Sequence, residues 1–341
     1  MGTENSMSRR KFIGRSVAGM GTLGLGASHP PELLASQPSS EDSPDRSSRE
    51  VSVLSVTMHR ISREHKHKTV EQMLTRLESL QAYEPDVICL PEAFATKVTE
   101  AESIDGPLVQ EFAAHARQHS CYVICPLHTK RDGKIFNTAV LLDRSGQIIG
   151  KYDKIHPNQF ECDDGICPAA GPPPVFKTDF GTIAIQICFD FNWIDDWRYL
   201  KENGAEIVFW PSAYPGGRML SGLAWLYKYY VVGTPAINPA LIYDMTGDLV
   251  SRSGRWEGHA FAKLNLEKML FEVDFNVPQV PEIRKKYGTK VSIQFFHDED
   301  WLTIESLSQD LTIAQLVKEF DLIPHWEYIK QANEVQEGLR I

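Results

Sequence analysis

The sequence predicts an α/β fold in which strands and helices alternate along the chain. Residues 183–187 form a short apolar, largely β-branched run that is typical of a strand buried in a covered sheet, and residues 51–58 alternate as a strand does. Between such runs, apolar residues recur at three- and four-residue spacing, as in residues 70–80, which indicates an amphipathic helix. The 341-residue chain is 42% hydrophobic and 23% charged, an ordinary composition for a globular protein with a full core.

The first 50 residues differ in composition from the rest of the chain. Arg9 and Arg10 precede a glycine-rich, weakly apolar stretch, and residues 1–27 therefore resemble a bacterial twin-arginine signal peptide. This stretch is too short and too rich in glycine to span a bilayer stably. The resemblance implies recognition by the twin-arginine translocation machinery and a periplasmic or secreted protein. Residues 28–50 are rich in Ser, Pro, Asp and Glu, so we expect a disordered linker there.

Charge and cysteine content limit the expected partners and cofactors. The formal net charge is -10, which repels phosphate backbones, so we expect no nucleic-acid partner. Six cysteines are too few for a disulfide scaffold in a chain of this length. Cys162 and Cys167 flank a polar turn and could either stay free or close a small loop. The sequence offers no further ligands at the spacing of a zinc site with these two cysteines, so we expect no metal and no cofactor.

The predicted domain begins near residue 51 with a strand, a helix and a second strand. The helix over residues 70–80 ends before Pro85, and residues 86–90 form the next buried strand. Glu92 directly follows this strand, which places a carboxylate at its carboxyl end. Such a group is either part of a functional site or a solvated strand terminus.

Antiparallel pairing is predicted further along the chain. Pro107 begins a second helix, and residues 121–127 form the strand after it. Residues 136–142 and 147–152 form a hairpin around an Asp-x-x-Gly turn, and the same turn recurs between residues 241 and 250.

Lys154 directly follows the first hairpin and begins an irregular, proline-rich segment that also contains Glu161. A lysine here is normally a surface residue, because lysine is rarely buried unless it is paired.

Cys188 lies where a buried strand gives way to a helix. The strand over residues 183–187 is followed by polar residues that open a helix, which Gly204 closes before the next buried strand begins at Ala205. At such a strand-to-helix turn a side chain can project from the sheet edge, and a neighbouring backbone N–H can face an oxyanion. The alternative for Cys188 is a buried structural thiol.

The remaining chain continues the same pattern. Residues 211–217 form a loop at the carboxyl end of a strand, the usual position of a binding loop in an α/β sheet. Residues 231–237 and 269–275 are predicted strands, and apolar residues at helical spacing occur around residues 313–320. Residues 281–341 are therefore expected to be a C-terminal extension, helical in part, that could pack at an oligomer interface.

Three short motifs resemble the nitrilase superfamily of carbon-nitrogen hydrolases. They place Glu92 in Leu-Pro-Glu, Lys154 in Tyr-Asp-Lys-Ile-His and Cys188 in Ile-Cys-Phe-Asp, in this order along the chain. Glu161 matches the second glutamate of the family. The resemblance implies a four-layer αββα sandwich that commonly pairs across a dimer, so we expect a carbon-nitrogen hydrolase domain over residues 51–280 and a homo-oligomer.

The resemblance also implies a hydrolase that cleaves a non-peptide carbon–nitrogen bond and releases ammonia or an amine. Cys188 would attack the substrate and form a thioester, Glu92 would move the protons, and Lys154 with the backbone N–H of Phe189 would stabilise the oxyanion. Glu161 would orient Lys154. Nitrilases proper tend to carry Cys-Trp-Glu, so the sequence Cys-Phe-Asp favours amide or N-carbamoyl substrates. Four aromatic residues near the motifs could line the substrate pocket or pack in the core: Phe94, Phe160, Trp193 and Tyr214.

Other functions remain open at this stage. A nitrilase acting on nitriles would use the same three residues. A non-catalytic binding protein on the same fold would be expected to have lost at least one of them, and all three are present. A papain-like hydrolase would use His156 as its base, but the sequence identifies no Asn or Asp partner for this histidine.

Overall fold

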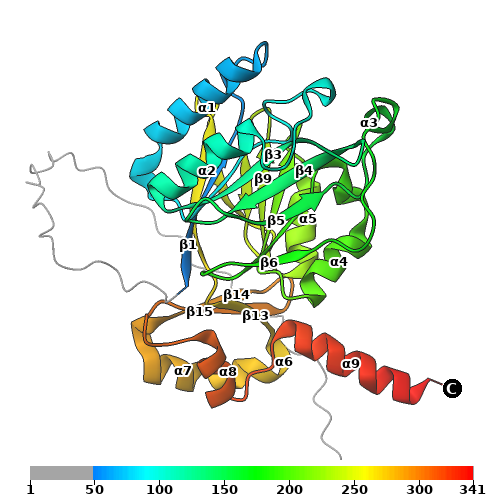
Figure 1. The fold of residues 1–341 in the computed structure, drawn as a ribbon. Coiled ribbons are helices and arrows are strands. Elements are labelled where there is room, and N and C mark those ends of the chain that lie inside the picture. The colour runs from blue at the N-terminus through cyan, green and yellow to red at the C-terminus, as the bar shows by residue number, and fades with distance from the viewer. Residues whose placement is uncertain (1–48, 341) are drawn as a thin grey trace, which may run out of the picture. The chain divides into compact units, whose positions relative to one another are not determined.

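The computed structural model describes residues 49–340 (Figure 1). The predicted signal peptide at residues 1–27 lies outside the described residues, as does the predicted linker up to residue 48. The described residues form two six-stranded sheets and one three-stranded sheet. Within this part of the chain, no helix is both long and apolar enough to cross a membrane.

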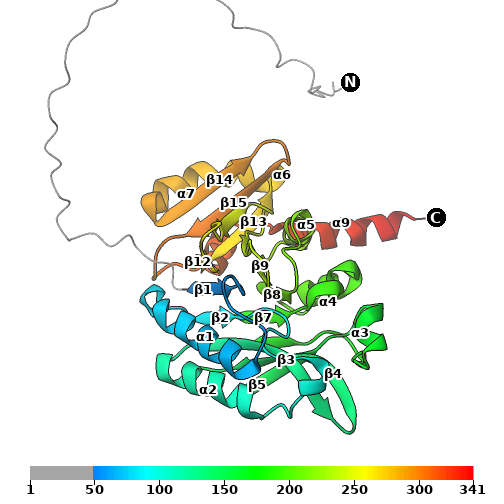
Figure 2. The ribbon, with the colours of Figure 1, turned by 90° about the horizontal axis from the view of Figure 1, so that it is seen from above.

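The first large sheet has the strand order β12-β1-β2-β3-β4-β5. Its first three strands along the chain run parallel, and the later ones pair antiparallel. The strands are β1 (Glu50–Val56), β2 (Val87–Cys89), β3 (Tyr122–Arg131), β4 (Lys134–Leu142), β5 (Ile148–Asp153) and β12 (His259–Asn265). Helices α1 (Lys66–Ser79) and α2 (Pro107–His119) lie side by side on its outer face (Figures 1 and 2).

The second large sheet has the strand order β11-β10-β9-β8-β7-β6. Helices α4 (Ile194–Glu202) and α5 (Arg218–Tyr227) pack on it through a separate apolar cluster. The strands are β6 (Val175–Lys177), β7 (Thr182–Ile185), β8 (Ile207–Ser212), β9 (Tyr230–Pro235), β10 (Leu241–Tyr243) and β11 (Leu249–Arg252).

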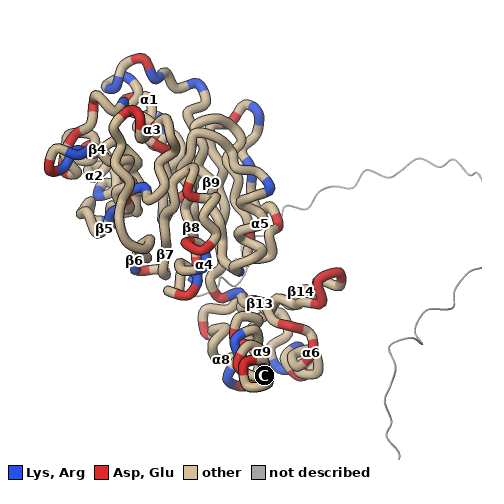
Figure 3. Tube along the Cα trace, turned by 90° about the vertical axis from the view of Figure 1, so that its right-hand side faces the viewer, with Lys and Arg blue, Asp and Glu red and all other residues tan. Residues whose placement is uncertain are grey.

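The two large sheets pack face to face, and the alternation of side chains along β1 shows how. Val51 and Val53 point into the cluster between the sheets, whereas Leu54 and Val56 point into the cluster beneath α1 and α2. The central strands β2, β7, β8 and β9 carry no charged residue, and Figure 3 shows the charged residues mainly in the surrounding helices and loops. Helix, sheet, sheet and helix thus follow one another, which confirms the predicted four-layer αββα sandwich.

A third sheet, of order β13-β15-β14, follows the sandwich. The predicted strand over residues 269–275 is wrong in its last part, because β13 ends at Glu272 and helix α6 (Val273–Asn276) follows directly. The other elements are β13 (Lys268–Glu272), α7 (Val280–Tyr287), β14 (Val291–Phe296), β15 (Trp301–Ser306), α8 (Ile313–Glu319) and α9 (His325–Leu339). Residues 281–341 were predicted to be helical in part. They contain helices α8 and α9, and also the strands β14 and β15, which were not predicted.

Short helices occupy several connections. In the segment expected to be irregular after Lys154, α3 (Gln159–Asp163) forms because Asn158 accepts a hydrogen bond from the backbone N–H of Glu161, while the Glu161 carboxylate accepts one from the N–H of Asn158. The 3₁₀ turns are Gln81–Tyr83, Val98–Glu100, Cys188–Asn192, Val277–Gln279 and Gly288–Lys290.

Candidate active site

Cys188 is the first residue of the 3₁₀ turn η3 (Cys188–Asn192), which follows β7. Its φ of 50° is uncommon for a residue other than glycine, so contacts must stabilise this conformation. The indole N–H of Trp210 donates a 2.9 Å hydrogen bond to the backbone carbonyl of Cys188. The side chain is buried, since the residue is only 5% exposed.

Asp190 ties this turn to the end of β5. Its carboxylate accepts hydrogen bonds from the backbone N–H of Ile187 (2.8 Å), the backbone N–H of His156 (2.9 Å) and the hydroxyl of Tyr152 (2.8 Å). Burial raises the pKa of Asp190 to about 6, although these donors act in the opposite direction. Asp190 therefore joins the segment that carries Lys154 to the turn that carries Cys188.

The ammonium group of Lys154 lies between two carboxylates. Its Nζ is 2.8 Å from Oε1 of Glu92 and 2.7 Å from Oε2 of Glu161. The Lys154 side chain is fully buried, so it is one of the paired lysines and not the surface lysine that the sequence left open. Burial disfavours the charge, but attraction by Glu92, Cys188 and Glu161 outweighs it and raises the pKa of Lys154 above its usual range.

Glu92 and Glu161 share a second donor, Asn137 on β4. The Nδ2 group of Asn137 lies 2.8 Å from Oε1 of Glu92 and 2.9 Å from Oε1 of Glu161. Asn137 was not predicted as a site residue, although an asparagine within the largely apolar strand β4 is a signal that could have identified it. The backbone carbonyl of Asn137 also accepts a hydrogen bond from the N–H of Lys154, which fixes the lysine against this strand.

The thiol of Cys188 lies within the electrostatic reach of this cluster. Its pKa is raised to about 12, first by burial and then by the Glu92 carboxylate, while Lys154 acts in the opposite direction. Hydrogen bonds from the backbone N–H of Ala213 and the hydroxyl of Ser212 also lower it. The resting thiol is therefore protonated near neutral pH, and a base is needed to make it a nucleophile.

The aromatic residues singled out in the sequence occupy different environments. Burial, and after it the interaction with Cys188, raise the pKa of Tyr214 to about 12. Tyr214 therefore lies near the thiol. Trp193 is exposed, at 39%, and packs edge-on against Phe189. Phe160 is 81% exposed on α3, next to Glu161. Phe94 is fully buried and packs edge-on against Phe112. Of the two roles that the sequence allowed, pocket lining and core packing, Phe94 has the second.

His156 has an acidic partner that the sequence did not reveal. Its Nε2 lies 2.8 Å from a carboxylate oxygen of Asp196, and its ring stacks on Trp193 at a centroid distance of 3.9 Å. Asp196 lies on α4, 40 residues further along the chain, so only the fold brings the two together.

The cysteines at residues 162 and 167 are both free, as are the four others in the described chain. The small disulfide loop that the sequence left open is therefore not formed. Cys162 is exposed on α3 and Cys167 is partly buried.

A family model connects this fold and site to known proteins. The sequence-family model of the carbon-nitrogen hydrolases matches residues 55–269. This range includes Glu92, Lys154, Glu161 and Cys188. Among solved structures, Saccharomyces cerevisiae Nit3, described as a member of branch 10 of the nitrilase superfamily, superposes with a TM-score of 0.58. That likeness covers 70% of this chain and 95% of Nit3 at 19% sequence identity, and it speaks to the fold alone.

Two curated relatives are named for reactions at carbon–nitrogen bonds. Beta-ureidopropionase from Arabidopsis thaliana is 34% identical over 148 residues, which cover 38% of this chain and 36% of that protein. Deaminated glutathione amidase from Synechocystis sp. is 27% identical over 163 residues, which cover 40% of this chain and 60% of that protein. This chain thus matches less than two thirds of the length of either relative.

Proposed function

This chain belongs to the carbon-nitrogen hydrolase family, and we propose that it hydrolyses an amide or N-carbamoyl bond through Cys188, Glu92 and Lys154. The family and two relatives named a ureidopropionase and an amidase support an enzyme of this kind. The observation that carries the choice of residues is the buried Lys154 ammonium between Glu92 and Glu161, beside a thiol whose charge state depends on both Lys154 and Glu92.

In the first step, Glu92 removes the proton of the Cys188 thiol. The sulfur then attacks the carbonyl carbon of the substrate and forms a carbon–sulfur bond, while the carbonyl π electrons move to oxygen. A base is required because the pKa of the thiol is raised to about 12, chiefly by burial. Glu92 is the proposed base because its carboxylate is, after burial, the largest cause of the raised pKa of the thiol.

The negative oxygen of the tetrahedral intermediate needs positive or N–H partners. Lys154 supplies a positive charge, and its amine stays protonated because its pKa is raised. The backbone N–H of Phe189 lies at the start of η3, where the leading N–H groups of a helical turn have no carbonyl partner within the turn. Each such donor is typically worth about 3 kcal/mol in the transition state. Glu161 positions Lys154 through a 2.7 Å contact.

Collapse of the intermediate breaks the carbon–nitrogen bond. The proton held by Glu92 moves to the departing nitrogen, so ammonia or an amine leaves and an acyl thioester remains on Cys188. Glu92 then removes a proton from water, the hydroxide oxygen attacks the thioester carbon, and the carbon–sulfur bond breaks. The thiol recovers its proton from Glu92, and the carboxylic or carbamic acid is released.

The proposed substrate class is an amide or N-carbamoyl compound. It is supported by the Cys-Phe-Asp sequence at residues 188–190 and by the names of the two relatives, a ureidopropionase and an amidase. A nitrile is the second candidate, because the same thiol can attack a nitrile carbon. The aromatic residues that we propose for the pocket are Phe160, Trp193 and Tyr214, since Phe94 lies in the core.

The resemblance at residues 1–27 supports a further part of the proposal. We infer export by the twin-arginine translocation machinery and a periplasmic or secreted location. The resemblance to the nitrilase superfamily, not this segment, supports a homo-oligomeric enzyme. A fusion of residues 1–50 to a reporter protein tests the export, because the reporter should leave the cytoplasm and a reporter with both arginines replaced by lysine should stay.

The experiment for the activity measures ammonia and amine release by residues 51–341. The panel contains short aliphatic amides, N-carbamoyl amino acids, secondary amides and nitriles, with Cys188→Ala as the blank. Release from an amide or N-carbamoyl compound that is absent in the blank supports the proposal. Release from nitriles alone would identify the second candidate, and equal release by Cys188→Ala would refute the role of the cysteine.

A further inference from the structure

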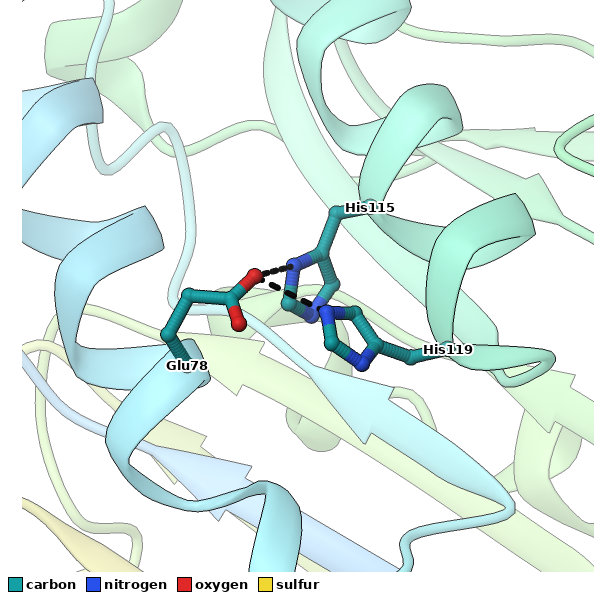
Figure 4. Close-up of side chains that lie close together, drawn as sticks. All are labelled: Glu78, His115 and His119. Atoms are coloured by element: carbon teal, nitrogen blue, oxygen red, sulfur yellow. Dashed lines mark hydrogen bonds and ion pairs between the residues drawn. The ribbon is translucent and has the colours of Figure 1, made fainter.

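Three potential metal ligands converge on the helical face outside the first large sheet. They are Glu78 near the end of α1 and His115 and His119 in the last part of α2 (Figure 4). Among residues 49–340 no other group of three such side chains has its ligand atoms this close together. None of the three belongs to the proposed active site, which is built from strand ends and η3.

The distances suit a small coordination sphere. Oε1 of Glu78 lies 2.8 Å from Nε2 of His119 and 3.3 Å from Nδ1 of His115, and the three ligand atoms all lie within 4.8 Å of one another. Zinc binds nitrogen and oxygen at about 2.0–2.2 Å, so ligand atoms around a tetrahedral ion are separated by about 3.3 Å. Side-chain movements of about 1 Å would therefore make room for an ion between these atoms.

The helices fix this arrangement. Residues four apart lie on the same face of a helix, so His115 and His119 project together from α2, with ring centroids 4.5 Å apart. Helix α1 lies beside α2 on the same sheet and contributes Glu78 (Figures 1 and 2). An ion bound here would join the two helices that cover this face of the sandwich.

A plain ion pair accounts for only part of this cluster. A pair with one histidine would satisfy the Glu78 carboxylate, and Nε2 of His119 already lies 2.8 Å from its Oε1. The structure nevertheless aims both imidazoles at one carboxylate oxygen. Two imidazoles and a carboxylate are the ligand set of several zinc sites, whereas Mg²⁺ and Ca²⁺ prefer oxygen ligands throughout.

We propose that Glu78, His115 and His119 form a binding site for a divalent transition-metal ion, with Zn²⁺ the best match. The site is partly open, since Glu78 is the most exposed of the three with a side chain 49% accessible, so a water molecule completes the coordination. Gln81 supports it from a second position, because its amide lies 3.2 Å from Nε2 of His115, the ring nitrogen that faces away from Glu78. The bound ion would act as a clamp between α1 and α2.

The test measures Zn²⁺ binding to the metal-stripped full chain by isothermal titration calorimetry. Cys162→Ser and Cys188→Ala are introduced first, because an exposed thiol and a reactive thiol would bind zinc themselves. His119→Gln and Glu78→Gln are then compared with this parent. Both positions reach the surface, so these variants are expected to fold, and the buried His115 is left unchanged. His67→Gln is the matched control, because His67 is an exposed histidine on α1 outside the cluster.

The expected result is one Zn²⁺ per parent chain, at least tenfold weaker binding in His119→Gln and in Glu78→Gln, and unchanged binding in His67→Gln. Zn²⁺ should also raise the thermal midpoint of the parent more than that of either cluster variant. No binding to the parent would overturn the proposal. Binding of equal strength in the parent and in both folded cluster variants would overturn it as well, because the ion would then lie elsewhere.

Discussion

At the residue scale, the thiol of Cys188 is held neutral, whereas the amine of Lys154 is held as a charged ammonium. Burial and the Glu92 carboxylate keep the thiol protonated, whereas two carboxylates keep the lysine charged despite its burial. The Lys154 ammonium, the positive charge that could stabilise a thiolate, is therefore already paired with Glu92 and Glu161. This arrangement differs from a preformed thiolate and requires that deprotonation be part of the reaction.

Alkylation of Cys188 by iodoacetamide tests the charge state of the free thiol. Because its folded-state pKa is raised to about 12, the thiolate fraction should increase about tenfold for each pH unit up to pH 9. The measurement is the alkylation rate between pH 6 and 9, with Cys162→Ser as background so that the exposed thiol does not react. A rate that is already constant between pH 6 and 7 would show a preformed thiolate and contradict this account.

Replacement of Lys154 by methionine tests the proposed oxyanion charge. Methionine nearly preserves the buried volume but removes the ammonium, so kcat should fall by about 100-fold or more, with a smaller effect on KM. Circular dichroism checks that the variant folds. Activity within tenfold of the parent would contradict the role of Lys154.

His156→Ala is the companion variant. The ring of His156 contacts Asp196 and Trp193, so its removal should be tolerated far better than Glu92→Gln. Asp196 lies 2.8 Å from His156 and is the acidic partner that a papain-like mechanism would need. The sequence had not identified this partner. Equal inactivation of both variants in folded form would favour that alternative.

At the element scale, the hairpin of β4 and β5 carries Asn137 and leads into Lys154, so its position matters for the site. Its turn lies against α2, where Gly146 has a φ of 78°. A side chain at Gly146 would overlap the backbone carbonyl of Ala113, which cannot move without shifting the helix. The turn between β3 and β4 contains Gly133 at a similar φ of 75°, but a side chain there would meet open space.

Gly146→Ala and Gly133→Ala separate these two effects. Both substitutions place alanine in a left-handed conformation, which costs about 1–2 kcal/mol. Only Gly146→Ala adds the overlap with α2, so it should lower the free energy of unfolding by clearly more than Gly133→Ala. The measurement is urea unfolding of both variants. Equal losses would show that the hairpin does not pack against α2 as described.

How far the sequence predicted these elements depended on how local the signal was. The helix at Pro107 and the buried strands around residues 87–89 and 207–212 follow from composition and periodicity within a few residues. Glu92, Lys154 and Cys188 were predicted at strand ends, and in the structure they follow β2, β5 and β7. Strands β12, β14 and β15 were not predicted, and the predicted strand at β13 extended into α6.

The parts that were missed depend on distant contacts. Asn137 becomes meaningful only when Glu92 and Glu161, which are 45 and 24 residues away, meet at its amide. Asp196 lies 40 residues from His156, and Glu78 lies 41 residues from His119. Periodicity reports the face on which a side chain lies but not its partner on another element. The i, i+4 histidine pair on α2 was not singled out from the sequence, and the glutamate beside it lies on another helix, α1.

At the scale of the whole described chain, Trp301 joins the third sheet to the sandwich. It belongs to the same apolar cluster as the residues between the two large sheets, and its ring lies 5.3 Å from that of Trp225 on α5. The ammonium of Lys228 lies 3.3 Å from the centroid of the Trp301 ring, a cation–π contact. The third sheet therefore shares a core with the catalytic part of the chain.

Trp301→Ala should accordingly destabilise the protein by about 3–5 kcal/mol, the usual cost of removing a large aromatic side chain from a core. Trp256→Ala is the matched control, because Trp256 is 68% exposed and its loss should change the free energy of unfolding little. Thermal and urea unfolding measure both variants. Similar stabilities would mean that the third sheet contributes no shared core.

The central claim is that the reaction passes through a thioester on Cys188, and the most direct measurement detects that adduct. The full chain is mixed with the amide or N-carbamoyl compound that it turns over, quenched with acid within the first turnovers, and digested for mass spectrometry. We expect the peptide that contains Cys188 to gain the mass of the acyl group, that is, the substrate without its leaving amine. Turnover with unmodified Cys188, together with activity retained in Cys188→Ala, would contradict the account.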